Sequence, residues 1–254
     1  MSITTHTSRN GNFTSSGIFA LMGAPKPCAT YIAEKNMERK LGRSLSMDKQ
    51  TKATLWGHFL EARVHDMLPM SYEQVGGKTI THPHIPYWTG TPDNICRIES
   101  VVGDTKSLEP KAFCSYVDVL MTGDIELFKK EEPQKYWQLV SNSILTGMKN
   151  IEPIVYMPYE SEIEAIRQMA SNYDGSDQWR YRFIAESPLC ELAYLPDGGY
   201  YKNLNRFRFE VPASDKEALT NAVLKYGKQL IQEPSLKTSP DNINGQHITV
   251  VEAA

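Results

Sequence analysis

The stretch GTPDNICRIESVVGDTKSL, residues 90–108, decides the fold that we predict for this chain. Apolar and β-branched residues in Ile95–Ile98 and at Val101 and Val102 are typical of two short strands. A turn near residues 99–100 would join these strands into a hairpin. Charged side chains on such a hairpin are poor material for a sheet core, so their placement needs a physical reason.

The acidic residues of this stretch predict a metal site. Residues two apart in a strand share a face, so Asp104 and Lys106 project the same way, with the Thr105 carbonyl between them. The turn would bring Asp93 opposite Asp104, where the two carboxylates repel unless a cation lies between them. Mg²⁺ accepts one or two carboxylates, a carbonyl and several waters.

Lys106 completes the chemistry that this site suggests. Its ammonium would face the metal-bound water and orient the nucleophile, or stabilise the charge that grows on a pentavalent phosphorus. The residues thus indicate hydrolysis of a phosphodiester. Taken alone, Asp93 followed by Asp104-x-Lys106 also fits a solvated strand edge with a surface ion pair.

Composition limits the functional classes. A chain of 254 residues with 41% hydrophobic content can bury one sizeable core, and we expect one domain. Lys and Arg total 27 against 30 for Asp and Glu, so the overall charge does not indicate nucleic-acid binding. Any contact with DNA must therefore be local. No apolar run approaches the ~20 residues of a membrane span and no signal peptide is visible, so we expect a cytoplasmic protein.

The four cysteines lack the spacing of a metal site. They are widely separated, without a CxxC pair or a histidine cluster, which argues against zinc and iron–sulfur centres. We interpret them as reduced packing thiols.

The expected order is helix, strands, helix, strand, which predicts an α/β sandwich. Apolar residues at helical spacing predict a helix over 51–68, strand signals follow over 71–108, a second helix begins at Pro133 and ends near Gly147, and IVYMPY reads as a strand. Capping boxes at Ser161–Glu164 and Ser214–Glu217 predict two later helices. The DGG turn between them suggests a peripheral hairpin.

We therefore predict a single nuclease domain over 1–235, with a flexible tail over 236–254. Its parts are a core over about 50–160, an N-terminal helical segment over about 14–45, and a peripheral hairpin with a C-terminal helix over about 180–233.

Two further polar residues lie on the predicted helices. Glu61, in the middle of the first helix, could complete a metal shell or hold a ligating water, although such a Glu often faces solvent. Gln138 lies near the start of the second helix, and a lone Gln proves nothing. The order Glu, Asp, Asp-x-Lys, Gln, each on the expected kind of element, is much harder to obtain by chance.

With these residues in view, the chain resembles the PD-(D/E)xK nuclease superfamily and, within it, the phage lambda-type exonucleases, or YqaJ-like viral recombinases. The resemblance runs from about Arg9 to Pro158. That family has a W-G-x-x-x-E helix, a strand with S/T-P-D, an E-x-K, and a helix with a Gln. The corresponding residues here are Trp56, Gly57 and Glu61, then Thr91, Pro92 and Asp93, then Asp104, Thr105 and Lys106, then Gln138.

A second match lies in RNGNFTSSGIFALMG, residues 9–23. The family has an R-x-G-x-x-T-x-S segment that opens a short helix, and its Arg and Ser hold the 5′-terminal phosphate of the DNA. By resemblance, Arg9 and Ser16 take these roles, which suits bidentate guanidinium and unpaired helix N–H groups. The alternative is that Ser16 is only an N-cap and Arg9 a tail residue.

Two positions depart from the family pattern, and one branch of the superfamily is excluded. Asp104 replaces the more common Glu, which shortens the reach to the metal by one methylene, and Asn94 stands where many members have Gly. Related iron–sulfur nucleases carry flanking cysteines with a CxxC-type cluster, which this chain lacks.

The resemblance implies a PD-(D/E)xK restriction-endonuclease-like core, a central mixed β-sheet flanked by helices. It implies a Mg²⁺-dependent 5′ to 3′ exonuclease that acts on double-stranded DNA ends in phage or prophage recombination inside the bacterial host cell, with Mn²⁺ left open as the metal. The metal ligands would be Asp93, Asp104 and the Thr105 carbonyl, with Glu61 for a second metal. Lys106 would act on the nucleophile, and Gln138 would steady the water or Lys106.

The resemblance also implies partners and leaves two other functions open. Family members supply single-stranded tails to a single-strand annealing protein, and several form trimeric rings around the duplex. One alternative is an endonuclease on the same fold, which would not need the phosphate anchor of Arg9 and Ser16. The other is a DNA-binding module that has lost the reaction, in which substitution of Lys106 or Asp93 would change nothing.

Overall fold

The computed structural model describes residues 9–45, 50–75 and 77–231. The predicted flexible tail over 236–254 lies outside the described residues. Within the described ranges, no helix is long and apolar enough to cross a membrane.

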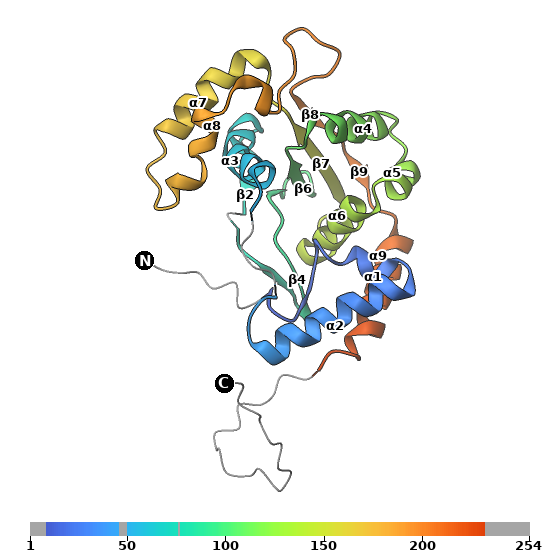
Figure 1. Cartoon of the computed structure of the whole chain (residues 1–254). Helices are drawn as coiled ribbons and strands as arrows, with labels where there is room; N and C mark the ends of the chain where they lie inside the picture. The colour runs from blue at the N-terminus through green and yellow to red at the C-terminus, as the bar shows by residue number, and fades with distance from the viewer. Residues whose placement is uncertain (1–8, 46–49, 76, 232–254) are drawn as a thin grey trace, which may run out of the picture.

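A mixed six-stranded sheet forms the centre of the molecule (Figure 1). Its strands follow the order β2–β5–β6–β7–β8, and β9 also pairs with β7. They span β2 (Glu73–Gln74), β5 (Asn94–Cys96), β6 (Val101–Lys106), β7 (Asn150–Tyr156), β8 (Leu204–Arg206) and β9 (Phe209–Glu210). The mixed α/β fold class predicted from the sequence is confirmed.

The predicted hairpin is confirmed in β5 and β6. The two strands are antiparallel, with Asn94 opposite Gly103, so that Asp93 at the entrance to β5 comes level with Asp104. Ser100, in the connecting turn, has a φ of 53°, which a turn of this kind requires. The sequence placed this turn correctly.

The parallel pairing of β6 with β7 requires a crossover. In the register of these strands, Asp104 lies beside Pro153 and Lys106 beside Val155. The crossover consists of α4 (Pro110–Met121), α5 (Ile125–Glu131) and α6 (Pro133–Thr146). It returns the chain past β6 and thereby carries Gln138 to the strand that holds Asp104.

Some of the strands predicted over 71–108 belong to a second, smaller sheet. It has the order β1–β4–β3 and comprises β1 (Phe13–Thr14), β4 (Ile85–Gly90) and β3 (Ile80–His82). β1 runs parallel to β4, so the N-terminal segment is anchored beside the strand that leads to the Asp93 loop.

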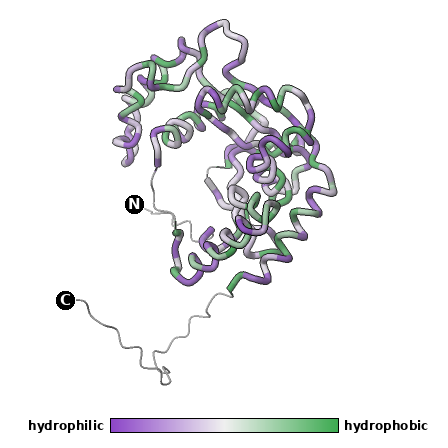
Figure 2. Tube along the Cα trace, turned by 45° about the vertical axis from the view of Figure 1, so that its right-hand side comes forward, coloured by the Kyte–Doolittle hydropathy of each residue, from purple (hydrophilic) through white to green (hydrophobic). Residues whose placement is uncertain are grey.

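Helices cover both faces of the central sheet (Figure 1). On one face, α3 (Lys52–Met67), α7 (Ile163–Ser171) and α8 (Arg182–Glu186) pack around Leu60, Ile154 and Tyr156. The other core contains the crossover helices with α1 (Phe19–Met22), α2 (Pro25–Leu41) and α9 (Ala213–Gly227). In Figure 2 the hydrophilic segments lie mainly on outer turns and loops, as expected around two apolar cores.

The two helices that carry predicted site residues are confirmed. Thr51 caps α3, because its side chain accepts a hydrogen bond from the Thr54 N–H, and the apolar face of this helix is buried. α6 begins at Pro133 and ends before Gly147, whose φ of 71° lies in the left-handed region that favours glycine.

The two later helices are confirmed as α7 and α9, but the predicted peripheral hairpin and both capping boxes are wrong. Over 181–192 the chain is helical, in α8 and in η4 (Leu189–Glu191), while β8 and β9 pair with β7 rather than with each other. Ser161 donates to Asp197, and Glu162 instead accepts from the Tyr159 N–H. Ser214 lies inside α9, whose N-cap position is Pro212. Tertiary contacts captured these polar groups, which local sequence reasoning does not foresee.

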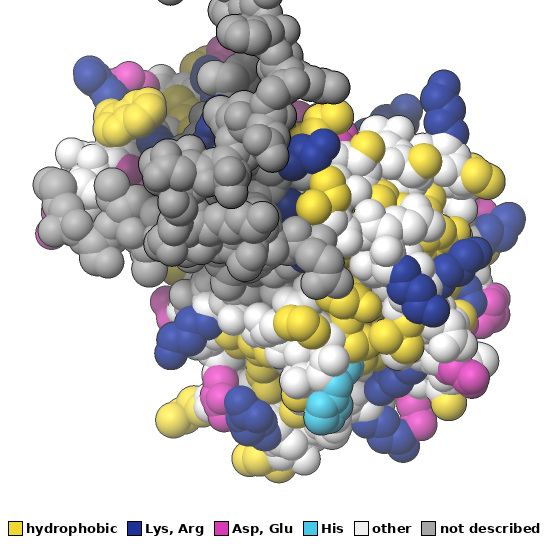
Figure 3. Space-filling view, turned by 90° about the horizontal axis from the view of Figure 1, so that it is seen from below, with side chains coloured by type: hydrophobic (Ala, Val, Ile, Leu, Met, Phe, Trp, Pro, Cys, Tyr) yellow, Lys and Arg dark blue, Asp and Glu magenta, His cyan; other side chains and the backbone are white. Residues whose placement is uncertain are grey.

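The surface agrees with the balanced net charge. In the view from below, Lys and Arg side chains lie scattered among acidic, polar and hydrophobic ones over the visible part of the face (Figure 3). No broad basic field is visible there.

Gly90 offers a direct test of the packing behind the Asp93 loop. A Cβ at this position would lie 2.2 Å from the Ser15 hydroxyl oxygen and 2.6 Å from Leu145 Cδ1. We expect Gly90→Ala to lower the free energy of unfolding by about 1–3 kcal/mol, as overpacking does. The matched control is Gly57→Ala within α3, where the nearest atom is 3.7 Å away and a gain of about 0.5–1 kcal/mol is expected. Urea denaturation measures both, and equal effects would contradict the packing seen at Gly90.

Candidate active site

Asp104 is the centre of a group of charged and polar side chains at the end of β6. It is only 2% exposed, and both of its carboxylate oxygens are engaged. Its Oδ2 lies 2.8 Å from Lys106 Nζ, and its Oδ1 accepts a hydrogen bond of 2.7 Å from Gln138 Nε2. The strand period brings Lys106 to the face of Asp104, and the crossover brings Gln138 there.

Asp93 converges on the same group, as the hairpin predicted. Its Oδ2 accepts a hydrogen bond of 2.7 Å from the Thr105 N–H. Burial, and next the negative charge of Asp104, raise the pKa of Asp93 to about 7. The two carboxylates therefore repel each other across a short distance, which the sequence led us to expect.

Glu61 joins this electrostatic group from α3. Burial raises the pKa of Glu61, Asp104 adds to the rise, and His58 and Lys106 oppose it. Glu61 lines a pocket of about 130 Å³ together with Asp93 and Thr105. The helix position of Glu61 is thus directed at the hairpin rather than at bulk solvent.

Lys106 supplies the positive charge of the group. Burial disfavours its ammonium, but the charges of Asp104 and Asp93 outweigh this and raise the pKa of Lys106. The side chain keeps 27% of its surface exposed, and its ammonium lies in the ion pair with Asp104. It is therefore charged near neutral pH.

Two residues that sequence reasoning undervalued position the hairpin. Asn94 is 3% exposed; its Nδ2 donates to Thr105 Oγ1 at 3.2 Å, and its Oδ1 lies 2.9 Å from His65 Nδ1. In the sequence Asn94 stands out only as a departure from the family pattern, and nothing there assigns a role to His65. The only sequence signal was that both lie close to predicted site residues, His65 one turn after Glu61 and Asn94 next to Asp93.

The described fold is shared with solved nucleases. Solved structures with similar folds include LHK-Exo in complex with dAMP, with a TM-score of 0.55, 16% identity, and coverage of 88% of this chain and 89% of that chain. The alkaline exonuclease LHK-Exo from Laribacter hongkongensis has a TM-score of 0.57 and 15% identity, and the match covers 87% of this chain and 89% of that chain. A phage related exonuclease from Haemophilus somnus 129PT has a TM-score of 0.54 and 13% identity, with coverage of 86% of this chain and 92% of that chain. This chain has the fold of these exonucleases.

The likeness to the exonuclease fold spans 86–88% of this chain. No protein-family model and no curated protein matches the sequence. At 13–16% identity the likeness establishes the fold, and the activity must be argued from the side chains.

The donor set of the site suits Mg²⁺ better than a softer metal. Among the described residues, no three His, Cys, Asp or Glu side chains are arranged as a ready-made metal cage. Two close carboxylates, a carbonyl and room for water are instead what Mg²⁺ requires, because it keeps much of its hydration shell. The β5–β6 register, which sets Asp93 level with Asp104, is the second observation that favours a divalent cation here.

The predicted phosphate-binding residues lie in the N-terminal segment around Tyr31. The Tyr31 hydroxyl accepts from the Thr14 N–H at 2.9 Å, and Thr14 Oγ1 lies 3.4 Å from Ser16 Oγ. Burial raises the pKa of Tyr31, and Arg9 is close enough to oppose that rise. Ser16 is exposed, but it does not open the helix, since α1 begins at Phe19 with Ile18 as its N-cap. Within the described ranges, no hydrogen bond or ion pair joins Arg9 or Ser16 to the carboxylate group.

Asn94 provides a test of the positioning network. Asn94→Ala would leave the Thr105 hydroxyl and one nitrogen of His65 without their partner, so we expect a loss of about 1–3 kcal/mol in unfolding free energy. Asn205→Ala is the control, because its amide donates only to the nearby Lys202 carbonyl on the surface. An Asn94→Ala protein as stable as the control variant in urea denaturation would contradict the network.

Proposed function

We propose that this protein is a divalent-metal-dependent deoxyribonuclease that degrades one strand of duplex DNA from a 5′ end. The observation that carries this proposal is the convergence of Asp93, Asp104 and Lys106 on the β5–β6 hairpin. The fold that this chain shares with solved exonucleases supports the proposal, because it is a fold on which DNA-degrading enzymes are built.

In this proposal Mg²⁺ is held by Asp93, Asp104 and the Thr105 carbonyl, with Glu61 available for a second ion, and Mn²⁺ is an alternative. When bound, the metal supplies a Lewis acid and a water of lowered pKa. The other contributions come from the protein. Gln138 fixes the Asp104 carboxylate through its 2.7 Å hydrogen bond, and the backbone N–H of Thr105 fixes Asp93.

Lys106 is proposed to act on the reacting phosphate. Its pKa is raised, so the ammonium stays protonated and can stabilise negative charge at the phosphorus while it orients the nucleophile. The ammonium is held 2.8 Å from Asp104, so the Lys106 side chain is already positioned and loses little conformational entropy during the reaction.

The preference for DNA ends rests on Arg9 and Ser16. An end-dependent enzyme needs an anchor for the terminal phosphate, and an endonuclease does not. Ser16 is exposed and Arg9 lies near the same tyrosine, which is compatible with a shared anion site. We further propose that residues 1–235 form one nuclease domain. Copies of the chain would assemble into a trimeric ring around the duplex, and a single-strand annealing protein would be the partner.

Substitution of the charged residues tests whether the chain is an enzyme. We expect Lys106→Ala and Asp93→Ala to lower the rate of nucleotide release by at least about 10²-fold, because each removes an electrostatic group aimed at the reaction. The measurement is acid-soluble nucleotide release from duplex DNA with Mg²⁺. Binding of DNA should be largely retained, and Lys225→Ala on α9 serves as the surface control. Full activity in both site variants would favour the inactive DNA-binding module.

A comparison of DNA ends tests the direction and the requirement for a terminus. We expect 5′-phosphorylated linear duplex to lose label from its 5′ terminus only when Mg²⁺ is present, with chelation stopping the reaction. Arg9→Ala and Ser16→Ala should reduce the preference for a 5′-phosphate over a 5′-hydroxyl by about tenfold, the value of one charge-assisted hydrogen bond. Efficient cutting of closed circular DNA would replace the exonuclease by the endonuclease alternative.

A further inference from the structure

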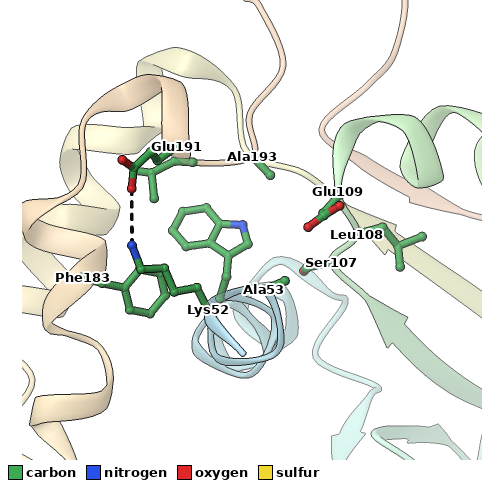
Figure 4. A pocket seen from close by; sticks show the side chains of 10 residues that line it. Lys52, Ala53, Ser107, Leu108, Glu109, Phe183, Glu191 and Ala193 are labelled. Atoms are coloured by element: carbon green, nitrogen blue, oxygen red, sulfur yellow. Dashed lines mark hydrogen bonds and ion pairs between the residues drawn. The ribbon is translucent and has the colours of Figure 1, made fainter. Parts of the chain in front are cut away.

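A second pocket opens one residue beyond Lys106. It has a volume of about 130 Å³ and lies between the N-terminal half of α3, the segment that follows β6, and the α8–η4 region. Figure 4 shows Phe183 on one side of this pocket and Ser107 and Glu109 on the other. Ser107 follows Lys106 directly, so the end of β6 leads from the proposed reaction centre to one wall of this pocket.

The walls of this pocket are aromatic and apolar. Trp56 and Phe183 both line it, with Leu192 beside them. Trp56 is 5% exposed and sits on α3, the same helix that carries Glu61 one turn further along. Flat aromatic walls of this kind favour a flat, weakly hydrated ring as the occupant.

Ser107 places an unused polar group in the pocket. Its hydroxyl oxygen is buried and has no hydrogen-bond partner within the part of the chain that the structure describes. An unpaired buried hydroxyl is costly, and it can both donate and accept, so a ligand with polar ring edges would satisfy it. Nothing else in the described fold explains a serine there.

The charges at the rim argue against a phosphate as the occupant. Lys52 lies 3.4 Å from Glu191, and both of these side chains are more than half exposed, which leaves Glu109 as the uncompensated charge. A phosphate would be repelled by that carboxylate. A carboxylate instead suits an exocyclic amino group, as it does where proteins accept a hydrogen bond from cytosine N4.

We propose that this pocket binds an unpaired nucleobase next to the phosphodiester that is cut. This rests on the proposed nuclease function, and it names how the strand is held at the centre. The base stacks between Trp56 and Phe183, its edge pairs with the Ser107 hydroxyl, and Glu109 accepts from its amino group. Because the pocket follows Lys106 in the chain, we assign it to a base of the substrate strand. The alternative occupant is the base of a nucleotide that has already been released.

The test is a scan with abasic DNA. A set of 5′-phosphorylated duplexes, each lacking one base near the terminus, is titrated against the Lys106→Ala protein, so that binding is measured without cleavage. We expect one position at which loss of the base weakens binding by about 5- to 150-fold, the range for one base stacked on an aromatic side chain. Phe183→Ala should abolish this difference, and Ser107→Ala should reduce it.

Control variants separate the pocket from general effects. Trp179→Ala removes a tryptophan that is 72% exposed and does not line the pocket, so the abasic profile should persist. Ser107→Ala removes only an unpaired hydroxyl, so thermal stability should not fall, and a purely structural serine would leave the abasic profile unchanged. Trp56 is deeply packed, and for this reason the two milder variants carry the test.

Each outcome decides between the claims. The proposed base pocket is overturned if no abasic position weakens DNA binding to the protein with an unsubstituted pocket. It is also overturned if the same positional effect remains in both Phe183→Ala and Ser107→Ala. Either result counts even if the protein is an active exonuclease. A clear profile in a protein that never cuts DNA keeps the pocket and overturns the nuclease. Added deoxyadenosine distinguishes the source: if it binds through Phe183 while the scan is flat, the pocket takes a released nucleotide, and the strand assignment is overturned.

Discussion

The mutual repulsion of Asp93 and Asp104 is the constraint on which the site depends. Two carboxylates on neighbouring strands, one of them almost completely buried, cannot be held together without compensation. In this fold the compensation comes from the Lys106 ammonium, from the Gln138 amide and from the Thr105 backbone N–H. Burial, and next the charge of Asp104, still raise the pKa of Asp93 despite these partners, and a further positive charge would stabilise both carboxylates.

The rest of the architecture positions these groups. The β5–β6 hairpin sets the carboxylates level with each other, the crossover through α6 delivers Gln138, and α3 lies across the strand end with Glu61. Asn94 and His65 then tie α3 to the hairpin from the side. Stability and chemistry are therefore coupled, since the hydrogen bonds that hold the hairpin in place also fix the distance between the carboxylates.

α3 and the end of β6 have two sides. Glu61 and Asp93 face one pocket, while Trp56 and Ser107 face the other, and the two pockets have similar volumes. The first is lined by oxygen atoms that suit a cation, and the second by rings that suit a base. In the proposed function, the first would take the phosphate of a DNA strand and the second one of its bases.

Local sequence patterns were sufficient for the elements that carry the site. The alternation around Asp104 and Lys106, the turn before Val101, the helix over 51–68 and the Pro133–Gly147 boundaries all depend on interactions within a few residues, and the structure confirms each. The same local reasoning failed at Ser161 and over 181–211, where the distant Asp197 and β7 pair with the polar groups and strand edges, and at Ser214, because α9 already begins at Ala213.

The sequence by itself determined that two carboxylates and a lysine share one hairpin, because the strand period and the turn leave few alternatives. Only the tertiary structure decided that Gln138 occupies an oxygen of Asp104, that Asn94 and His65 brace Thr105, and that Trp56 and Ser107 enclose a pocket beside the site. These contacts join residues far apart in the chain, and their geometry follows from how helices pack on the sheet, which no local pattern encodes.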